Sequence, residues 1–298
     1  NQKDQILHLF HFQKIYKLPV RILYTHQLVN RDHKFGSFLR KLGPFPVDEF
    51  EKRIAYLHKR FNFITLDEYE GCFLERRKPS FPSMVLTFDD GYHTVYTEVF
   101  PLLRKYSIPA TVFLTTDCVD GDRVLLHDQL IYLIGTGKVS GFNLPTLSDK
   151  TYSLTTERER LVTFTDISSR LKKIPNEERE QILNQLGTIQ NVNIDEIRTN
   201  IKMLSWENIS EMYRSGLISF EAHTVTHPIL TRISLGQVKD ELQSAKSIIE
   251  SHLNKEVRFL AYPNGRKDDF NASIKNLTRE SGYSLAFTTL EYTRQEYY

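Results

Sequence analysis

The sequence predicts an α/β protein built from parallel β/α units, with one mostly helical insertion. Short β-branched and aromatic runs alternate with segments of helical periodicity along most of the chain. The links between them are short, which favours parallel strands joined by crossover helices. The alternation stops between residues 117 and 205, where the pattern is mostly helical.

Composition limits the class of protein and of partner. At 298 residues, the chain can bury a large core, as one barrel-type domain or two smaller ones. The formal net charge of +2 is too small to indicate a nucleic-acid partner, so a neutral or weakly charged ligand fits better. No apolar run approaches the ~20 residues that cross a bilayer. Cys72 and Cys118 lie in no metal-type spacing, which favours free thiols and leaves a single bridge open.

The first half of the chain contains four predicted strands and two predicted helices. Apolar residues at helical spacing and an acidic first turn indicate a helix over residues 47–61. A loop is expected over 30–43, and a second helix over 95–106. The strands are expected at 19–28, which ends near His26, and at 63–66, 84–88 and 110–115.

The insertion at 117–205 is expected to lie on the rim of the fold rather than to form an independent domain. Helices are predicted at 125–134, 161–171 and 177–186. Thr156 and Glu159 form a capping-box pattern ahead of the second helix. Two roles stay open for the insertion: it could extend the core, or it could form a wall of a substrate groove.

The alternation resumes after the insertion. Ser234 and Gln237 form another capping-box pattern, which opens a helix that runs to Leu253. The remaining helices are expected at 205–214 and 273–281, and the strands at 217–221, 257–262 and 285–289.

Polar residues gather where three of these strands end. Asp89 and Asp90 follow the buried strand at 84–88, and leaving both desolvated without a partner would cost several kcal/mol. His223 and His227 follow the strand at 217–221. The strand at 257–262 carries a third cluster, and the carboxyl ends of strands share one mouth in a parallel β/α barrel, so we expect the clusters to meet.

The two histidines and one carboxylate suit a metal ion. Three protein ligands leave positions open, as in catalytic zinc sites. The alternative is that His223 and His227 are polar residues of the rim. The zinc-protease motif does not apply, because Thr224 stands where that motif needs glutamate.

Three segments together resemble a known family. The chain is similar to the polysaccharide deacetylases, carbohydrate esterase family four, also called the NodB-homology domain. The resemblance predicts one catalytic domain over 1–298 with the insertion 117–205, and it implies a distorted (β/α)7 TIM-like barrel. The segments are Thr87-Phe88-Asp89-Asp90-Gly91, His223-Thr224-Val225-Thr226-His227 and Arg258-Phe259-Leu260-Ala261-Tyr262-Pro263.

The resemblance also implies roles for individual residues. Asp90, His223 and His227 would hold a divalent metal, usually zinc, with cobalt, nickel or manganese as alternatives. Asp89 would be the general base, and Arg258 would pair with it and keep it ionised. The backbone N–H of Tyr262 would stabilise the oxyanion, with Pro263 and Tyr92 also placed at the substrate.

The sequence offers two candidates for the general acid. Many family members carry a Leu-x-His motif in the last strand, and residues 285–289 contain no histidine. In a closed barrel the first and last strands are neighbours, so His26 could take the same place. Tyr24-Thr25-His26 resembles, with one extra residue, a Tyr-His pair of the poly-β-1,6-N-acetylglucosamine deacetylases. His93 is the second candidate, Asp268 and Asp269 partly resemble the fourth motif, and Trp206 is interpreted as a packing residue.

The function implied by the resemblance is metal-dependent removal of N-acetyl groups from N-acetylglucosamine units of a polysaccharide. The polymer could be poly-N-acetylglucosamine, chitin-like or peptidoglycan-like. A catalytically impaired carbohydrate-binding or scaffolding protein and an O-acetyl xylan esterase remain alternatives. Glycoside hydrolysis is disfavoured, because two adjacent acids do not flank a sugar bond. A location in the cell envelope or outside the cell is favoured; a cytoplasmic one is open because no leader is visible, and the oligomeric state is open.

Overall fold

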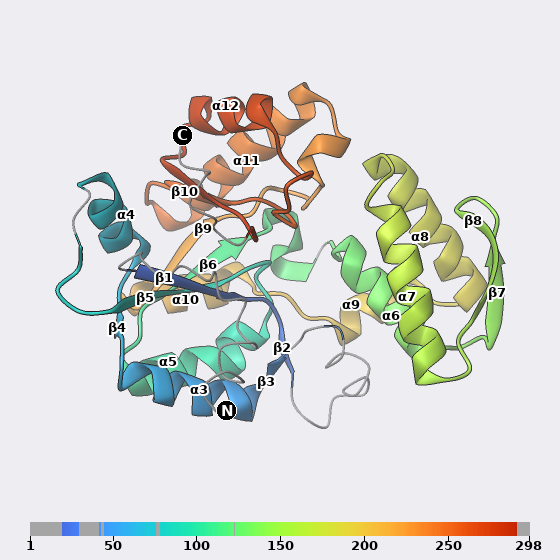
Figure 1. Cartoon of the computed structure of the whole chain (residues 1–298), viewed down its shortest axis with the longest axis horizontal. Helices are drawn as coiled ribbons and strands as arrows, with labels where there is room; N and C mark the ends of the chain where they lie inside the picture. Colours follow the sequence, from blue (N-terminus) through green and yellow to red (C-terminus); the bar gives the residue numbers. More distant parts are fainter. Residues whose placement is uncertain (1–19, 30–41, 43–44, 76–77, 122, 291–298) are drawn as a thin grey trace.

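The fold is organised around one parallel sheet. The computed structural model describes residues 20–29, 42, 45–75, 78–121 and 123–290. The sheet has the order β1-β5-β6-β9-β10-β11, with β4 paired to the start of β5 (Figure 1). Every pair within it is parallel, as the alternation of strands and helices predicts. The strands are β1 (Val20–Thr25), β4 (Asn62–Phe63), β5 (Ser83–Phe88), β6 (Ala110–Leu114), β9 (Ile218–Ala222), β10 (Phe259–Ala261) and β11 (Leu285–Phe287).

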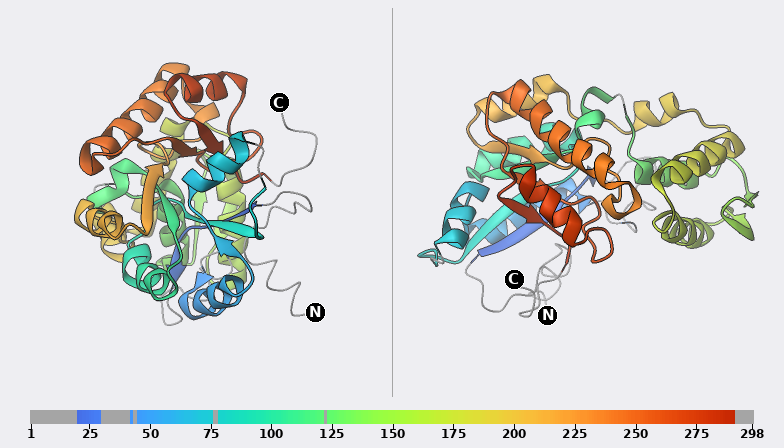
Figure 2. Two further views of the ribbon diagram at one scale, coloured as in Figure 1. Left: turned by 90° about the vertical axis from the view of Figure 1, so that its left-hand side faces the viewer. Right: turned by 90° about the horizontal axis from the view of Figure 1, so that it is seen from above.

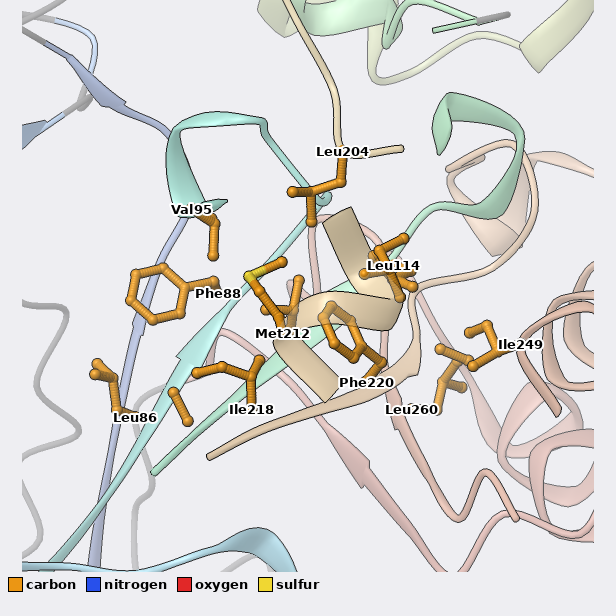
Figure 3. Packing of buried hydrophobic residues seen from close by; sticks show 14 of the residues in the cluster. Leu86, Phe88, Val95, Leu114, Leu204, Met212, Ile218, Phe220, Ile249 and Leu260 are labelled. Carbon is orange, nitrogen blue, oxygen red and sulfur yellow. The ribbon is translucent and has the colours of Figure 1, made fainter. Parts of the chain in front are cut away.

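Helices cover the outer face of the curved sheet (Figure 2). The largest apolar cluster lies between them, and strand residues such as Leu86, Phe220 and Leu260 pack there against Met212 and Ile249 of the helices (Figure 3). Burial of such side chains contributes about 1.5–3 kcal/mol each. The covering helices are α3 (Val47–His58), α5 (Phe100–Tyr106), α10 (Trp206–Arg214), α11 (Leu235–Leu253) and α12 (Ala272–Glu280).

The inner face of the sheet has a smaller core. One helix that packs on it was not predicted from the sequence. Phe113 of β6 and Phe287 of β11 pack there with ring centroids 5.6 Å apart. Within the described residues, β1 and β11 form no ladder, so the barrel is open between its first and last strands. Helix α4 (Leu66–Leu74) adds Leu66 and Tyr69 to this core. The parallel half-barrel sheet is consistent with the expected distorted barrel, but the described residues of β1 and β11 do not close it.

The helix predicted over 95–106 is two segments. A π-helical turn over Val95–Val99 leads directly into α5. Pro101 lies in the first turn of α5, and its ring would clash with the carbonyl four residues earlier in a continuous α-helix. The wider π turn accommodates that proline.

The insertion packs around a core of its own. Its hydrophobic cluster includes Leu133, Ile167 and Leu186 and is separate from the two clusters of the sheet. The insertion extends to one side of the sheet (Figure 1, Figure 2). It contains α6 (Leu126–Thr136), α7 (Glu157–Leu171), α8 (Asn176–Gln190), α9 (Ile194–Asn200) and an antiparallel hairpin, β7 (Gly141–Leu144) with β8 (Ser148–Ser153), after the 3-10 segment Thr116–Gly121.

The remaining elements are short. Strands β2 (Leu28–Val29) and β3 (Phe45–Pro46) form a two-stranded parallel pair, and a 3-10 turn covers Leu230–Arg232. Of the loop predicted at 30–43, only Leu42 lies within the described residues. Pro19, at the start of the first predicted strand, also lies outside them. None of the described helices is long and apolar enough to cross a membrane.

Candidate metal centre

Asp90, His223 and His227 meet at the carboxyl ends of β5 and β9. One ligand atom from each residue lies within 4.8 Å of the others, and all three residues are buried. The Nε2 atoms of His223 and His227 lie 3.6 Å and 3.4 Å from Oδ1 of Asp90. The side chains expected to bind a metal are therefore in position to hold one cation.

The backbone around these residues is strained. Asp90 (φ 74°), Thr224 (φ 67°) and His227 (φ 58°) all have left-handed conformations, which cost non-glycine residues about 1–3 kcal/mol each. The carboxylate of Glu241 on α11 holds the histidine turn, because it accepts hydrogen bonds from the N–H groups of Val225 (2.7 Å) and residue 226 (2.9 Å). Such strain persists where the surrounding contacts fix a functional geometry.

The hydrogen-bonding pattern of the triad favours a bound cation. Nδ1 of His223 lies 2.8 Å from the carbonyl oxygen of Ala261 and donates to it, so its Nε2 carries a lone pair toward Asp90. Both carboxylate oxygens of Asp90 are buried and accept no hydrogen bond from the described residues. The lone pairs of the imidazole nitrogens and of the Asp90 carboxylate repel one another when no proton lies between them. A bound cation would remove this repulsion. The residues therefore fit a divalent metal with nitrogen and oxygen ligands.

Burial shapes the charges of these groups. It raises the pKa of Asp90 well above its usual value, and the charges of Asp89 and Asp128 add to this shift. Burial also lowers the pKa of His223 to about 3 and that of His227 well below its usual value. The imidazoles are thus neutral near pH 7, which is the form that binds a metal.

His26 lies beside Asp89. Its Nε2 is 3.8 Å from Oδ2 of Asp89, and its side chain is 43% exposed, so the imidazole is accessible from solvent. Burial raises the pKa of Asp89 to about 7. His93 packs its ring against Tyr96, with centroids 5.9 Å apart, and belongs to neither this pair nor the triad.

The predicted pair of Arg258 with Asp89 is wrong. Arg258 comes immediately before β10, so it lies at the amino end of that strand, whereas Asp89 follows the carboxyl end of β5. The guanidinium group donates instead to the carboxylates of Asp67 and Glu70. Arg258 therefore holds α4 against the sheet, and the side-chain nitrogen that lies near the Asp89 carboxylate comes from His26 instead.

Two of the residues expected at the substrate are in the core. The backbone N–H of Tyr262 donates to the carbonyl oxygen of Phe287 (3.0 Å) in the β10–β11 ladder, so it is not available for an oxyanion. Its ring points to the outer core, where its hydroxyl bonds Thr278 (2.9 Å). Pro263, which follows it, is buried and has no N–H. The expectation for Tyr262 failed because the register of the last strand is not visible in the sequence.

The hydroxyl of Tyr92, another residue expected at the substrate, has partners in the insertion. Its side chain is buried, and its hydroxyl donates to the carboxylate of Asp128, 2.9 Å from Oδ2. The same hydroxyl lies 3.0 Å from Nε2 of His127, whose ring centroid is 5.7 Å from that of His227. The insertion therefore contributes a wall beside the metal centre.

His127 and Asp128 were absent from the predictions. Burial lowers the pKa of His127 to about 3, and the charges of Lys172 and Arg179 add to this effect. Burial raises the pKa of Asp128 to about 7, although the hydrogen bond from Tyr92 opposes the shift. The available signal was the polar run His127-Asp128-Gln129 within a mostly apolar helical segment at 125–134.

Other residues noted in the sequence have structural contacts. Trp206 stacks on His252, with centroids 3.7 Å apart, and also lines a pocket of about 610 Å³ between α10 and the insertion. Asp269 accepts a hydrogen bond from the backbone N–H of Arg266 (2.9 Å). Cys72 and Cys118 are free thiols.

Solved structures share this fold. A structure of IcaB from Ammonifex degensii superposes with a TM-score of 0.56 at 19% identity, covering 90% of this chain and 83% of that one. The Streptococcus pyogenes deacetylase PplD, solved in complex with acetate, gives a TM-score of 0.54 at 17% identity, covering 91% and 83%. At such identities the likeness concerns the fold.

Sequence comparison gives the family. A poly-beta-1,6-N-acetyl-D-glucosamine N-deacetylase of Staphylococcus aureus (strain MSSA476) is 22% identical over 89% of this chain and 69% of its own length. The chain spans about two thirds of the length of the curated relatives it matches. The family model for polysaccharide deacetylase matches residues 76–286, which include the metal triad. The chain therefore belongs to the polysaccharide deacetylase family.

Proposed function

We propose that the chain is a divalent-metal-dependent N-deacetylase that acts on N-acetylglucosamine residues of a polysaccharide. The observation that carries the proposal is the buried Asp90 carboxylate, which accepts no hydrogen bond from the described residues and faces two imidazole nitrogens. Membership of the polysaccharide deacetylase family supports the reaction class. A glycan substrate favours a site of action in the cell envelope or outside the cell.

The proposal assigns the metal to Asp90, His223 and His227, with zinc as the preferred ion and cobalt, nickel or manganese as alternatives. A divalent cation bound there supplies Lewis-acid activation of a water molecule and of the acetyl carbonyl group. The three side chains reach it from rigid strand ends, and the hydrogen bond from His223 to Ala261 fixes the orientation of one imidazole.

Two further groups carry the proton transfers in this proposal. Asp89 is the general base, because a carboxylate with a pKa near 7 accepts a proton effectively at neutral pH. His26 is the general acid that protonates the leaving amine. Its place beside Asp89 and its partial exposure support this role.

Acetate release tests the proposal. Oligomers of N-acetylglucosamine with β-1,6 and β-1,4 linkages are incubated with the zinc-loaded wild type and with the variant Asp90→Asn, with and without chelator. We expect acetate only from the wild type without chelator. Activity that neither the chelator nor the substitution affects would refute the mechanism, and tight binding without acetate release would favour a carbohydrate-binding protein.

The same assay separates the esterase alternative. An O-acetyl esterase would release acetate from acetylated xylan oligomers and leave the amide of N-acetylglucosamine intact. Comparing the two substrates at equal concentration gives the ratio of the two kcat/KM values. We expect this ratio to favour the amide.

A further inference from the structure

A pocket of about 610 Å³ lies between the barrel and the insertion. Its wall comes from the 3-10 segment Thr116–Gly121, from α6, α8 and α9 of the insertion, and from Trp206 at the start of α10. The volume lies within the range of about 300–1,000 Å³ that is usual for ligand sites. Among the described residues, those that line the pocket include none of the proposed metal ligands or proton-transfer groups. The pocket is therefore a site of its own.

Backbone hydrogen bonds join the wall of this pocket to the metal centre. The N–H of Thr116 donates to the carbonyl oxygen of Thr224 at 3.2 Å, and the next N–H donates to that of Val225 at 3.0 Å. Both acceptors lie in the turn that carries the two proposed histidine ligands. Leu126 also lines the pocket, and the ring centroid of the residue that follows it lies 5.7 Å from that of His227. The same two segments border both sites, so the pocket lies next to the metal centre.

The wall of the pocket contains a buried hydroxyl group without a partner. Thr116 is 6% exposed, and its Oγ1 makes no hydrogen bond with the described residues. A buried hydroxyl without a partner destabilises a fold, so such groups normally bond to protein, to water or to a ligand. A ligand that carries hydroxyl groups can supply the missing partner, because a hydroxyl both donates and accepts.

Amide and aromatic side chains provide further contacts in the pocket. The exposed side chain of Asn184 offers a donor and an acceptor, and Gln129 donates to the carbonyl oxygen of Val124 (2.9 Å) and keeps its amide oxygen as an acceptor. Trp206 stacks one face of its ring on His252 and also lines the pocket. An aromatic ring gives the C–H face of a sugar an apolar surface to pack on. The combination suits a sugar, which has polar edges and apolar faces.

The charges that line the pocket nearly cancel. The charged lining residues are Asp117, Asp120, Arg123, Glu180 and Arg198. With three carboxylates and two guanidinium groups, the pocket has no excess of positive charge that would favour an anion. The guanidinium of Arg123 is paired with Glu180, and that of Arg198 with Asp195 on its own helix. A neutral sugar therefore fits the pocket better than an anionic one.

We propose that this pocket binds an uncharged sugar residue of the glycan, away from the sugar that loses its acetyl group. The inference rests on the proposed function and adds a second contact with the same substrate. Because a polysaccharide repeats its units, a second site next to the metal centre raises the effective concentration of the chain there. Trp206, which was interpreted as a packing residue, then has two roles: it packs on His252 and contacts the sugar.

Fluorescence tests the proposal, because Trp206 is the only tryptophan of the chain. The full-length Asp90→Asn variant in chelator, in which catalysis is removed, is titrated with β-1,6 and with β-1,4 N-acetylglucosamine tetramers. We expect at least one tetramer to change the emission of Trp206 in a saturable way, with a Kd of about 1 mM or lower. No saturable change with either tetramer would overturn the proposal.

Substitutions in the same Asp90→Asn background locate the bound sugar. Thr116→Val keeps the shape of the side chain and removes the unpartnered hydroxyl, so it should weaken binding about fivefold without lowering the melting temperature. Asn184→Ala removes an exposed amide of the pocket and should weaken binding by a similar factor. Asn276→Ala, which removes an exposed asparagine of α12, is the matched control and should leave the affinity unchanged.

The results separate this proposal from the deacetylase function. Unchanged affinity in both Thr116→Val and Asn184→Ala would overturn the pocket as a sugar site, because the change in emission would then come from binding elsewhere. An equal loss in Asn276→Ala would do the same. Acetate release by the zinc-loaded wild type is measured independently and still supports deacetylation if the pocket binds no sugar. Saturable binding that depends on the pocket, without acetate release by the wild type, would contradict only the catalytic function.

Discussion

Replacing Asp90 by asparagine should abolish stabilisation by a divalent cation without destabilising the metal-free protein. The side chain is fully buried, and its oxygens accept no hydrogen bond from the described residues, so the substitution breaks no such bond. Asparagine has nearly the same shape and avoids the cost of a buried charge. The variant loses one ligand of the triad, and with it most of the affinity for the metal.

The size of the effect follows from linkage. A ligand that binds only the folded protein stabilises it by about 2.7 kcal/mol at a hundredfold excess over Kd. For a chain of 298 residues, an unfolding entropy of about 2.1 cal/mol/K per residue gives about 0.6 kcal/mol/K in total. The wild-type melting temperature should therefore rise by about 4 °C when zinc is added at that excess.

Thermal melts with zinc and with chelator measure this shift. Asp90→Asn should melt at the same temperature in both conditions and, in chelator, no lower than the wild type. Asp240→Asn changes an exposed aspartate of α11 and should respond to zinc like the wild type. An equal shift in Asp90→Asn, or no shift of the wild type with zinc, cobalt, nickel or manganese, would refute the assignment of the metal site.

Three further substitutions test the remaining roles. His26→Ala should lower kcat by about two orders of magnitude, with unchanged zinc content by atomic absorption. Normal turnover in His26→Ala together with a loss of turnover in His93→Ala would assign the general acid to His93 instead. Arg258→Ala should lower the free energy of unfolding in urea by about 1–2 kcal/mol, because buried Glu70 loses its partner, and kcat should stay near that of the wild type. A fall in kcat without a loss of stability would instead indicate a catalytic role for Arg258. The folded pKa of Asp128 is raised to about 7 from 3.8, so the folded state binds an extra proton between these values and loses stability as pH rises through them. Asp128→Asn lacks this loss and should gain stability relative to the wild type between about pH 4 and about pH 7 in chelator; a difference independent of pH would contradict the burial of a titrating carboxyl.

Local signals predicted most of the elements around the site. The capping boxes at Thr156 and Ser234 open α7 and α11 where the sequence places them, since both partners of each box lie within four residues. The helix α4 has such a box at Thr65 and Glu68, but its first residue, Leu66, continues an apolar run that also suits a strand. Strand β8 reads Ser-Asp-Lys-Thr-Tyr-Ser and lacks apolar alternation, so nothing local indicated it.

Side-chain partners were harder to predict than elements. The motif spacing places Arg258 near the third cluster. However, β10 begins one residue later, at Phe259, so Arg258 lies at the opposite end of the strand from the site. The orientation of Tyr262 depends on strand parity: the side chain of Ala261 packs in the core of the inner face, so the side chain of the next residue faces the outer core. The contact between Tyr92 and Asp128 joins the barrel to the insertion, and no pattern within either segment contains that information.

The proposed metal ligands and the residues beside them come from different parts of the chain. Asp90, His223 and His227 come from the turns that follow β5 and β9, which are fixed by the core of the sheet, whereas His127 and Asp128 come from an insertion with a core of its own. Tyr92 and Asp128 connect the two parts beside the metal centre. A change that loosens the insertion core should therefore displace His127 before it weakens the proposed binding of a divalent cation, because the strained turns that carry the proposed ligands are held by contacts within the barrel, such as that of Glu241.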